Sequence, residues 1–512
     1  MLRSIPTFAP RQVLARPAFA GLVVLAALAA LAPLSGCSTH PEIQPSLQRL
    51  EGEPLGVQGA EPAPVAQDLS PWWEAYGDAR LSSLIQQALT GNPNMQAAVA
   101  RLQRVAAQER FTRGADLPQL QASAEVDRQR FTEHGLVPPP LAGAVANTGT
   151  LQLSGSWEID LFGKQHAEVE ASIGQTRASE ADVQATRVLL SSQVARHYVA
   201  LGRLQAQVSV LQRTLGQRDD VLKLIRQRVQ AGLDTSVELR QGEGALPDAR
   251  LQIEALNEQV MLTRHALAVL TGQAPNALDT LEVQLDALRL PAMPAAVPVD
   301  LLARRADVMA ARWRVEATGH QTDAARALFY PNVDLVSYAG YNAIGLDRLL
   351  KPGSWQWGLM PAIHLPLFDG DRRIANLQGR VAEQDVSVAS YNQTVLQAVQ
   401  ETVDQLGSLQ AIARQQTEQR AAQGHTEAAY ALATERYRAG LGNYLNVLAA
   451  ETAVLNQRRQ AVDLQARTLD AQFSLVRAVG GSLQPGGAAA PAAAITPSTT
   501  DAKQTHKSGD PA

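Results

Sequence analysis

The 512-residue chain contains one cysteine and only 4% aromatic residues. A single cysteine excludes an intramolecular disulfide framework and any zinc site built from several cysteines. An excess of one charge sign is missing as well. Because 45 lysines and arginines stand against 49 aspartates and glutamates, the chain has no basic footprint for nucleic acid. Few aromatics beside abundant Ala, Gln, Leu and Arg favour long helices with thin apolar seams.

Signs of a reaction centre are also lacking. The sequence has no complete phosphate loop, dinucleotide-binding turn or nucleophile elbow. Its nine histidines are scattered without the spacing of metal ligands. We therefore expect no catalytic residue, no metal site and no enzymatic activity.

The first 36 residues resemble a bacterial lipoprotein signal peptide. Arginines precede an apolar run at 21–31, and Leu34-Ser35-Gly36-Cys37 follows directly. Cleavage before Cys37 would leave that residue to carry S-diacylglycerol and N-palmitoyl chains, the only covalent group we expect. The alternative is a single transmembrane helix followed by an incidental cysteine. Ser38 after the cysteine resembles the sorting signal for the outer membrane.

The rest of the sequence is internally duplicated. Residues 228–233 read RVQAGL and residues 436–441 read RYRAGL, an offset of 436 − 228 = 208. Gly232, Leu233, Gly440 and Leu441 are expected at the tips of helical hairpins, because glycine suits the left-handed position that ends a helix.

The duplication predicts the domain organisation. The first repeat covers residues 71–275 and the second covers 299–481, with a Pro-rich linker at 276–298 between them. Residues 37–70 are predicted to be an acylated N-terminal tether, and residues 482–512 a disordered tail.

Each repeat has two segments in which apolar and polar residues alternate. They are 117–130 and 151–162 in the first repeat, and 331–342 and 355–368 in the second. Such lengths suit tilted strands that cross a membrane, with Trp355 and Trp357 in an aromatic girdle. The alternative is a half-buried sheet in a soluble domain. Four strands cannot close a membrane barrel, so two chains with eight strands or three chains with twelve are implied.

The remaining segments have a seven-residue apolar repeat. It runs through 204–229, where only Arg218 interrupts it, and through 441–476 from Leu441 and Leu445 onward. A strict period of seven indicates long helices that supercoil around partners.

Several short motifs together resemble the TolC-like outer membrane efflux proteins, in their NodT-type, OprM-like lipoprotein branch. The motifs lie over most of the chain, from Cys37 to Gly481. They are Trp72-Trp73-Glu74, Asn92-Pro93-Asn94, Trp157-Glu158-Ile159-Asp160-Leu161-Phe162-Gly163, Arg304-Arg305-Ala306-Asp307-Val308, Phe329-Tyr330-Pro331 and Leu365-Pro366-Leu367-Phe368-Asp369-Gly370.

The resemblance implies a homotrimer in the outer membrane of a Gram-negative bacterium, with a twelve-stranded β-barrel continued by a periplasmic coiled-coil α-barrel. It would be a passive exit duct for drugs or other small toxic compounds, supplied by an inner-membrane pump through a periplasmic adaptor. The alternative function is a lipid-anchored periplasmic coiled-coil structural or adaptor protein without a pore. The exported substrates and the class of pump stay open.

The resemblance also points to a gate in the second repeat. Tyr437 and Arg438 are candidates by position. Ala449 stands where the family often has an acidic residue, so Glu451, two residues further on, is a third candidate.

Overall fold

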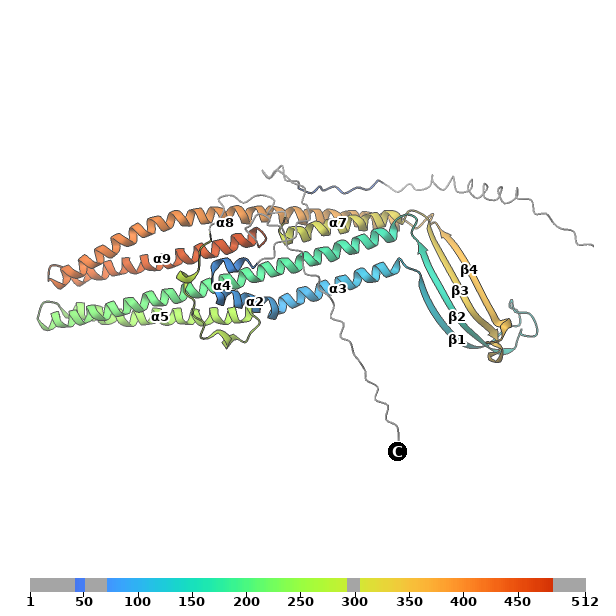
Figure 1. The fold of residues 1–512 in the computed structure, drawn as a ribbon, viewed down its shortest axis with the longest axis horizontal. Helices are drawn as coiled ribbons and strands as arrows, with labels where there is room; N and C mark the ends of the chain where they lie inside the picture. Colours follow the sequence, from blue (N-terminus) through green and yellow to red (C-terminus); the bar gives the residue numbers. More distant parts are fainter. Residues whose placement is uncertain (1–41, 51–70, 292–303, 482–512) are drawn as a thin grey trace, which may run out of the picture. The chain divides into compact units, whose positions relative to one another are not determined.

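The computed structural model describes residues 42–50, 71–291 and 304–481. The predicted signal peptide, Cys37 and the predicted tail at 482–512 lie outside the described residues. The described residues form long helices and one antiparallel sheet (Figure 1). In chain order the elements are η3 (Trp72–Tyr76), α2 (Ala79–Gly91), α3 (Pro93–Ala115), β1 (Gln119–Arg130), β2 (Val145–Ile159), α4 (Lys164–Gln230), α5 (Ser236–Leu270), η4 (Pro275–Leu278), η5 (Leu285–Ala287), α7 (Ala306–Ala327), β3 (Asn332–Ile344), η6 (Leu346–Arg348), η7 (Pro352–Ser354), β4 (Trp355–His364), α8 (Arg372–Arg438) and α9 (Tyr444–Ala478).

The chain divides into two compact units. The first comprises Met1–Arg49, Leu102–Ala178 and Ala311–Tyr391, and it contains the sheet. The second comprises Leu50–Arg101, Ser179–Ala310 and Asn392–Ala512, and it contains the two helical hairpins α4–α5 and α8–α9.

The sheet has the order β1-β2-β3-β4, with antiparallel neighbours throughout. All four strands differ in extent from the sequence prediction, β1 and β3 by at most two residues at either end and β2 and β4 by more. β2 begins at Val145 rather than 151, because main-chain pairing continues until Val145 meets Arg130. It ends at Ile159 rather than 162, because the carboxylate of Asp160 accepts the backbone N–H groups of Lys164 and His166 at 2.8 Å and caps α4 instead.

β4 also ends early, at His364 rather than 368. Pro366 follows within two residues, and proline has no N–H with which to continue a strand ladder.

The register gives the sheet one apolar and one polar face. Residues directly opposite each other in an antiparallel pair share a face. Leu151 lies opposite Tyr341, which lies opposite Trp355, and Leu153 is aligned with Ala339 and Trp357 in the same way. Gln152, Gly340 and Gln356 are aligned on the other face, where Gln356 donates a hydrogen bond to Gln152 at 3.3 Å. Within the single chain, Trp357 remains 71% exposed.

The duplication is visible in the helices. α4 and α8 each have 67 residues, and α5 and α9 each have 35. The turns match as well. Gly232 has φ 72° and Gly440 has φ 75°, and the next residue in each turn donates its N–H to a carbonyl five residues earlier at 2.8 Å. Both hairpins therefore end in the same glycine-dependent cap.

A second equivalence lies at the opposite ends of the hairpins. Asn92 donates a side-chain hydrogen bond to the carbonyl of Leu270 at 2.8 Å, and Arg305 donates one to the carbonyl of Ala478 at 3.0 Å. The two acceptors are separated by 478 − 270 = 208 residues, the offset of the tip motif. The side-chain amide of Asn92 and the guanidinium of Arg305 therefore have the same role in the two repeats, because each donates to a carbonyl at the C-terminal end of a helix.

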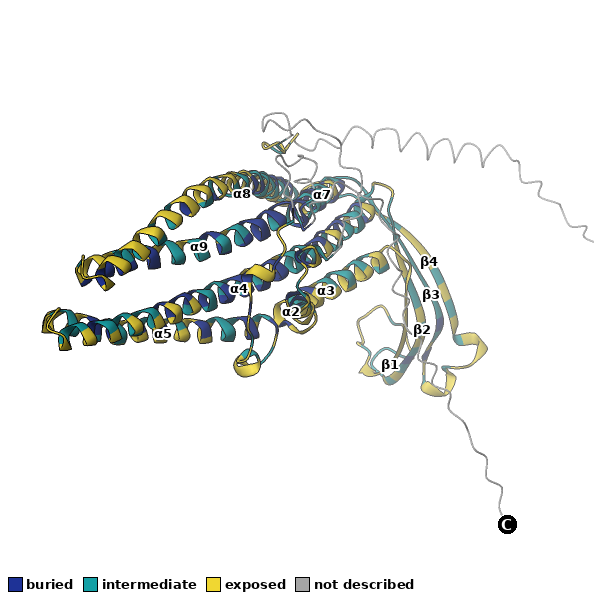
Figure 2. Ribbon diagram, turned by 60° about the vertical axis from the view of Figure 1, so that its left-hand side comes forward, coloured by how far each residue is buried: buried dark blue, intermediate teal, exposed yellow. Residues whose placement is uncertain are grey.

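The main core of the helical unit gathers around η3. Trp73 and Tyr76 are buried there with Tyr198 of α4 and Phe473 of α9, and the rings of Tyr76 and Phe473 lie 4.7 Å apart. Figure 2 shows buried stretches in dark blue along α4 and α9. This is the segment with the Trp-Trp-Glu motif. Its aromatic residues join the first repeat to the last helix.

The predicted apolar seam of α9 is wrong at its start. Leu441 and Leu445 are 69% and 52% exposed. α9 begins only at Tyr444, after Asn443 caps it by accepting the N–H of Asn446, so the turn shifts the frame. The residues buried in the first turns of α9 are Tyr444, Val447, Glu451 and Val454, whereas from Leu455 onward the predicted seam residues Leu455, Leu469, Phe473 and Val476 are buried.

None of the helices within the described ranges has a stretch that is long and apolar enough to span a membrane.

The glycine-dependent cap leads to a prediction. Gly440→Ala forces a side chain into the left-handed region and should weaken the α8–α9 turn by about 1 kcal/mol. Gly442→Ala is the matched control, because Gly442 is not among the positive-φ glycines and its added Cβ would meet its nearest neighbour at 3.6 Å. Hydrogen exchange of residues 439–446 should accelerate only in Gly440→Ala. Equal rates in both variants would contradict the cap.

Candidate functional site at the hairpin tips

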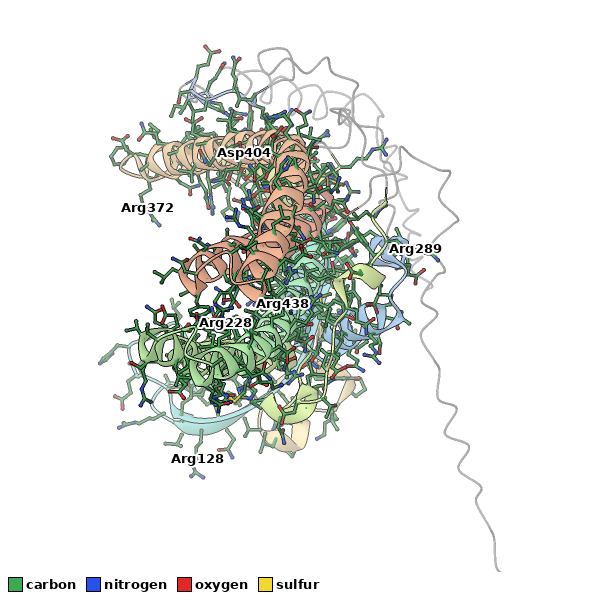
Figure 3. The ribbon with its side chains drawn as sticks, turned by 90° about the vertical axis from the view of Figure 1, so that its left-hand side faces the viewer. Arg128, Arg228, Arg289, Arg372, Asp404 and Arg438 are labelled. Carbon is green, nitrogen blue, oxygen red and sulfur yellow. The ribbon has the colours of Figure 1, made fainter. Side chains whose placement is uncertain are left out.

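The turns of the two hairpins are joined within one chain. Arg228 near the end of α4 donates a hydrogen bond at 3.1 Å to the carbonyl oxygen of Tyr437 near the end of α8. The guanidinium carbon of Arg228 also lies 4.8 Å from the centre of the Tyr437 ring, a cation–π distance. Seen onto the tips, Arg228 and Arg438 lie close together (Figure 3).

A carboxylate completes this contact. Asp234, in the turn after α4, accepts hydrogen bonds from Arg228 Nε at 2.9 Å and Nη2 at 3.2 Å. The Tyr437 hydroxyl donates a short hydrogen bond to the same carboxylate. We call Arg228, Asp234 and Tyr437 the tip clamp. A bidentate Arg–carboxylate pair is geometrically specific, so the clamp fixes the α8 end against the first turn.

The surroundings of the clamp are dry on one side. The Tyr437 side chain is fully buried and packs in an apolar cluster with Ile225, Tyr444 and Val447. Burial raises the pKa of the Tyr437 hydroxyl, and the hydrogen bond to Asp234 raises it further. Burial opposes ionisation of Asp234, but the hydrogen bonds from Arg228 and Tyr437 together lower its pKa. At neutral pH the clamp therefore holds a neutral phenol between charged partners.

A buried ion pair lies further along the same hairpins. Arg218 of α4 and Glu451 of α9 meet at 3.0 Å, with side chains only 10% and 9% exposed. Arg218 also donates a hydrogen bond at 2.8 Å to the carbonyl of Ala245 in α5. The arginine that interrupts the apolar seam of α4 is thus paired with a carboxylate that interrupts the seam of α9.

The Glu451 carboxyl group is strongly affected by its position. Burial raises its pKa, and the attraction of Arg218 only partly offsets this effect. The charged or titratable groups around it are Arg218 itself, Asp248 of α5 at 3.6 Å from Arg218, and the hydroxyls of Tyr430 and Tyr444, whose own pKa values are raised by burial and by Glu451.

The other predicted site residues lie apart from these groups. Arg438 is exposed beside the clamp, and so are Gly232, Leu233, Gly440 and Leu441 in the two turns. Trp355 and Trp357 lie in β4 of the other unit and are largely exposed. Cys37 is outside the described residues.

Two members of these contacts were missed by the sequence argument. Thr235 caps α5, in a capping box with Glu238, and its neighbour Asp234 binds Arg228 instead. Arg218 was noted only as a flaw in the seam. Arg218 in the predicted seam of α4 was the available signal, whereas Glu451 lies outside the predicted seam of α9.

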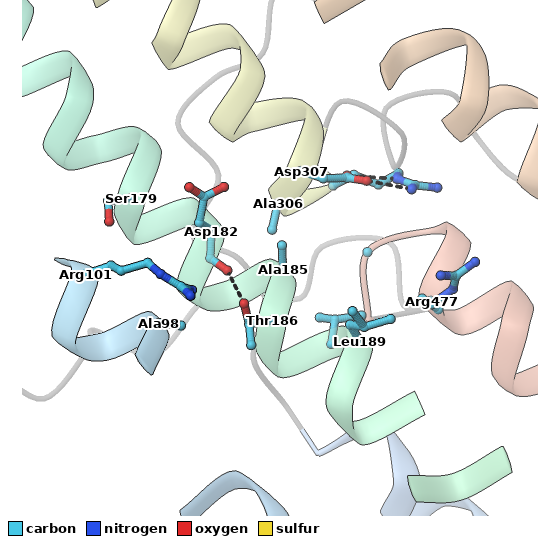
Figure 4. Close-up of a pocket in the computed structure, with 13 residues that line it drawn as sticks. Ala98, Arg101, Ser179, Asp182, Ala185, Thr186, Leu189, Ala306, Asp307 and Arg477 are labelled. Carbon is cyan, nitrogen blue, oxygen red and sulfur yellow. Dashed lines mark hydrogen bonds and ion pairs between the residues drawn. The ribbon is translucent and has the colours of Figure 1, made fainter. Parts of the chain in front are cut away.

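A cavity of about 420 Å³ lies in the helical unit, away from the tips (Figure 4). Arg101 of α3 extends there towards Asp182 and Thr186 of α4, and Arg477 lies on its other side. In the part of the chain that the structure describes, no group of three or more His, Cys, Asp or Glu side chains is placed to hold a metal ion.

Comparison with known proteins agrees with this architecture. The family described as "Outer membrane efflux protein" matches residues 84–273 and 297–481. The multidrug resistance outer membrane protein MdtQ of Escherichia coli is 32% identical over 462 residues, which cover 88% of this chain and 95% of that protein.

Solved structures are similar as well. The outer membrane protein VceC of Vibrio cholerae is 33% identical with a TM-score of 0.77, over 81% of this chain and 99% of that one. The outer-membrane channel OprN is 25% identical with a TM-score of 0.78, over 88% and 100% of the two chains.

The Arg218–Glu451 pair can be tested by a double-mutant cycle. Glu451→Ala leaves a buried guanidinium without its partner and should destabilise the protein by about 3 kcal/mol. Arg218→Leu combined with Glu451→Leu should recover much of that loss, because an apolar pair removes both desolvation costs. Thermal unfolding in detergent, followed by circular dichroism, measures both. If the free energy of unfolding lost in the double variant equals the sum of the losses in Arg218→Leu alone and Glu451→Leu alone, the two side chains do not interact.

The pKa of Glu451 predicts a pH effect. A carboxyl group with a raised folded-state pKa stabilises the fold most below the usual value of about 4.3, and this stabilisation is lost as the pH rises through the raised pKa. The stability of the wild type relative to Glu451→Gln should therefore increase as the pH falls from 7 towards 4. A difference that stays constant over this range would contradict the raised pKa.

Proposed function

The chain belongs to the outer membrane efflux protein family and is an outer-membrane channel protein, and on this basis we propose that it is the passive exit duct of a tripartite efflux system. An inner-membrane pump would deliver drugs or other small toxic compounds to it through a periplasmic adaptor. The similarity to MdtQ, which is named as a multidrug resistance outer membrane protein, supports this substrate class. The observation that carries the proposal is the sheet with one apolar and one polar face.

We propose that three chains form the pore. The outer edges of β1 and β4 pair with no strand among the described residues, and open edges cannot be satisfied in lipid. Three sheets of four strands would close these edges in a barrel of 3 × 4 = 12 strands. The apolar face would then contact lipid, with Trp355 and Trp357 in an aromatic girdle, and polar residues such as Gln152 and Gln356 would line the pore.

The lipid anchor belongs to the same proposal. Cys37 would carry S-diacylglycerol and N-palmitoyl chains in the periplasmic leaflet of the outer membrane. The two repeats, 71–275 and 299–481, would place their hairpin tips in the periplasm. Exposed Leu233 and Leu441 in the turns then offer apolar contacts to the adaptor.

The tip clamp is proposed as part of the gate. An outward movement of α8 and α9 away from α4 must break the hydrogen bond between Tyr437 and Asp234 and the ion pair between Arg218 and Glu451. Arg438, exposed beside Tyr437, is a candidate to contact a neighbouring chain or the adaptor. Such a gate is a two-state rearrangement of packed helices, which adaptor binding would favour.

Two other functions fit less well. An enzyme would need a reaction centre, and we propose that the chain acts only as a conduit. A pore-less coiled-coil protein would share the hairpins, but the apolar face of the sheet would have no partner in it.

The gate is tested in planar bilayers. The purified protein should be closed for most of the time. Tyr437→Phe removes only the hydroxyl that binds Asp234, so the open probability should rise, by roughly tenfold if one hydrogen bond to a charged group is lost. Tyr444→Phe is the control, because its ring lies 6.1 Å from that of Tyr437 in the same cluster while Asp234 accepts the hydroxyl of Tyr437.

Equal open probabilities in Tyr437→Phe and the wild type would remove the clamp from the gate. If neither the wild type nor Tyr437→Phe conducts, the pore itself is contradicted.

A further inference from the structure

A short N-terminal segment is seated on the sheet-bearing unit. Ile43 packs against a buried cluster formed by Ala325 near the end of α7 and by Leu377 and Val381 of α8, and Phe329 packs against the same cluster. The Arg326 guanidinium donates a hydrogen bond at 3.4 Å to the carbonyl of Ile43. An apolar side chain and a main-chain carbonyl of the predicted tether are therefore both held.

The next contact is a carboxylate that binds main chain. Asp385 of α8 accepts the N–H of Ser46 at 3.0 and 3.1 Å, the hydroxyl of Ser46 at 2.7 Å and the N–H of Leu47 at 3.0 Å. The hydrogen bond from the Ser46 hydroxyl, together with those from the N–H groups, lowers the pKa of Asp385. An ionised carboxylate with several donors makes hydrogen bonds stronger than those between neutral groups.

The segment runs in the same direction as α8. Ile43 lies by Leu377 and Val381, Ser46 binds Asp385, and the N–H of Leu50 donates to Asn392 at 2.8 Å. From Ile43 to Leu50 an extended chain spans about 24 Å. From Leu377 to Asn392 a helix spans about 22 Å. The two lengths agree, so the segment follows α8 and is not attached at a single point.

We propose that the surface of α7 and α8 formed by Ala325, Leu377, Val381 and Asp385 is a docking site for the acylated tether, and that it fixes how far the lipid anchor can lie from the strands. The proposal rests on the acylation of Cys37 under the proposed function. Cys37 is 43 − 37 = 6 residues from Ile43, a reach of about 20 Å at most. Phe329, which packs against the same cluster as Ile43, precedes the first residue of β3 by three positions. A docked tether thus keeps the acyl chains beside the base of the sheet.

An undocked tether would not do so. The next fixed point in the chain is η3 at Trp72, 72 − 37 = 35 residues from Cys37. A chain of that length extends up to about 120 Å. The contacts at Ile43 and Asp385 therefore reduce the maximum distance between Cys37 and the nearest fixed residue about sixfold. Asp385 is accordingly a positioning residue for the anchor.

The first test is hydrogen exchange on the full acylated protein. In Asp385→Ala, exchange at the amides of Ser46 and Leu47 should be at least about tenfold faster than in the wild type. Asp385→Asn keeps a carbonyl acceptor and should lie between the two. Asp404→Ala, an exposed acid on the same helix, is the matched control and should leave these amides unchanged. Equal exchange in Asp385→Ala and the wild type would overturn the docking site.

The second test measures the anchor. With Cys37 acylated, Gln44→Cys introduces the one free thiol, and a fluorophore there reports its depth in phosphatidylethanolamine–phosphatidylglycerol vesicles through quenchers at known lipid positions. The docked tether should give a single depth, and Asp385→Ala a broad range. A single, unchanged depth in Asp385→Ala would overturn the positioning role. Loss of conductance in the wild type would instead contradict the proposed function, so the two failures are separable.

Discussion

The structure depends on a sheet whose apolar face and outer edges have no partner in the described part of the chain. The four strands pair with one another, yet among the described residues no strand pairs with the outer edge of β1 or of β4, and one face of the sheet keeps its apolar side chains exposed. In water that face favours aggregation, and in lipid the open edges are costly. The long helices are under a related constraint. Their seams are thin, so contacts between hairpins must supply what a thick core would supply in a globular protein.

The two polar contacts between the hairpins differ in physical character. The tip clamp gains geometric specificity from a bidentate arginine, and its Arg228 and Asp234 side chains are only 12% and 10% exposed. The Arg218–Glu451 pair is buried, and desolvation cancels much of its attraction. The clamp therefore sets the geometry of the two turns, while the Arg218–Glu451 pair sets which helix faces which.

Most of the architecture could be predicted from the sequence because it repeats. The offset of 208 residues locates both hairpins, and the alternating segments locate all four strands. The details that escaped prediction depend on contacts between distant residues. The frame of α9 shifted because Asn443 starts the helix later than the apolar repeat suggests. Asp160 lies beyond the end of β2 because its carboxylate caps α4. The partners Asp234–Tyr437 and Arg218–Glu451 are 203 and 233 residues apart in sequence, and residue spacing carries no information about such pairs.

One feature of the first hairpin has a mechanical meaning. α5 contains Pro247, which lacks the N–H for one rung of the helical ladder, whereas α4, α8 and α9 contain no proline. The guanidinium of Arg218 binds the carbonyl of Ala245, two residues before this weak point, and so braces it from the neighbouring helix. A force that bends the first hairpin would act on the helix turn weakened by Pro247, and Arg218, which also binds Glu451, stabilises this turn. Bending stiffness and the contact between the hairpins would therefore rise and fall together.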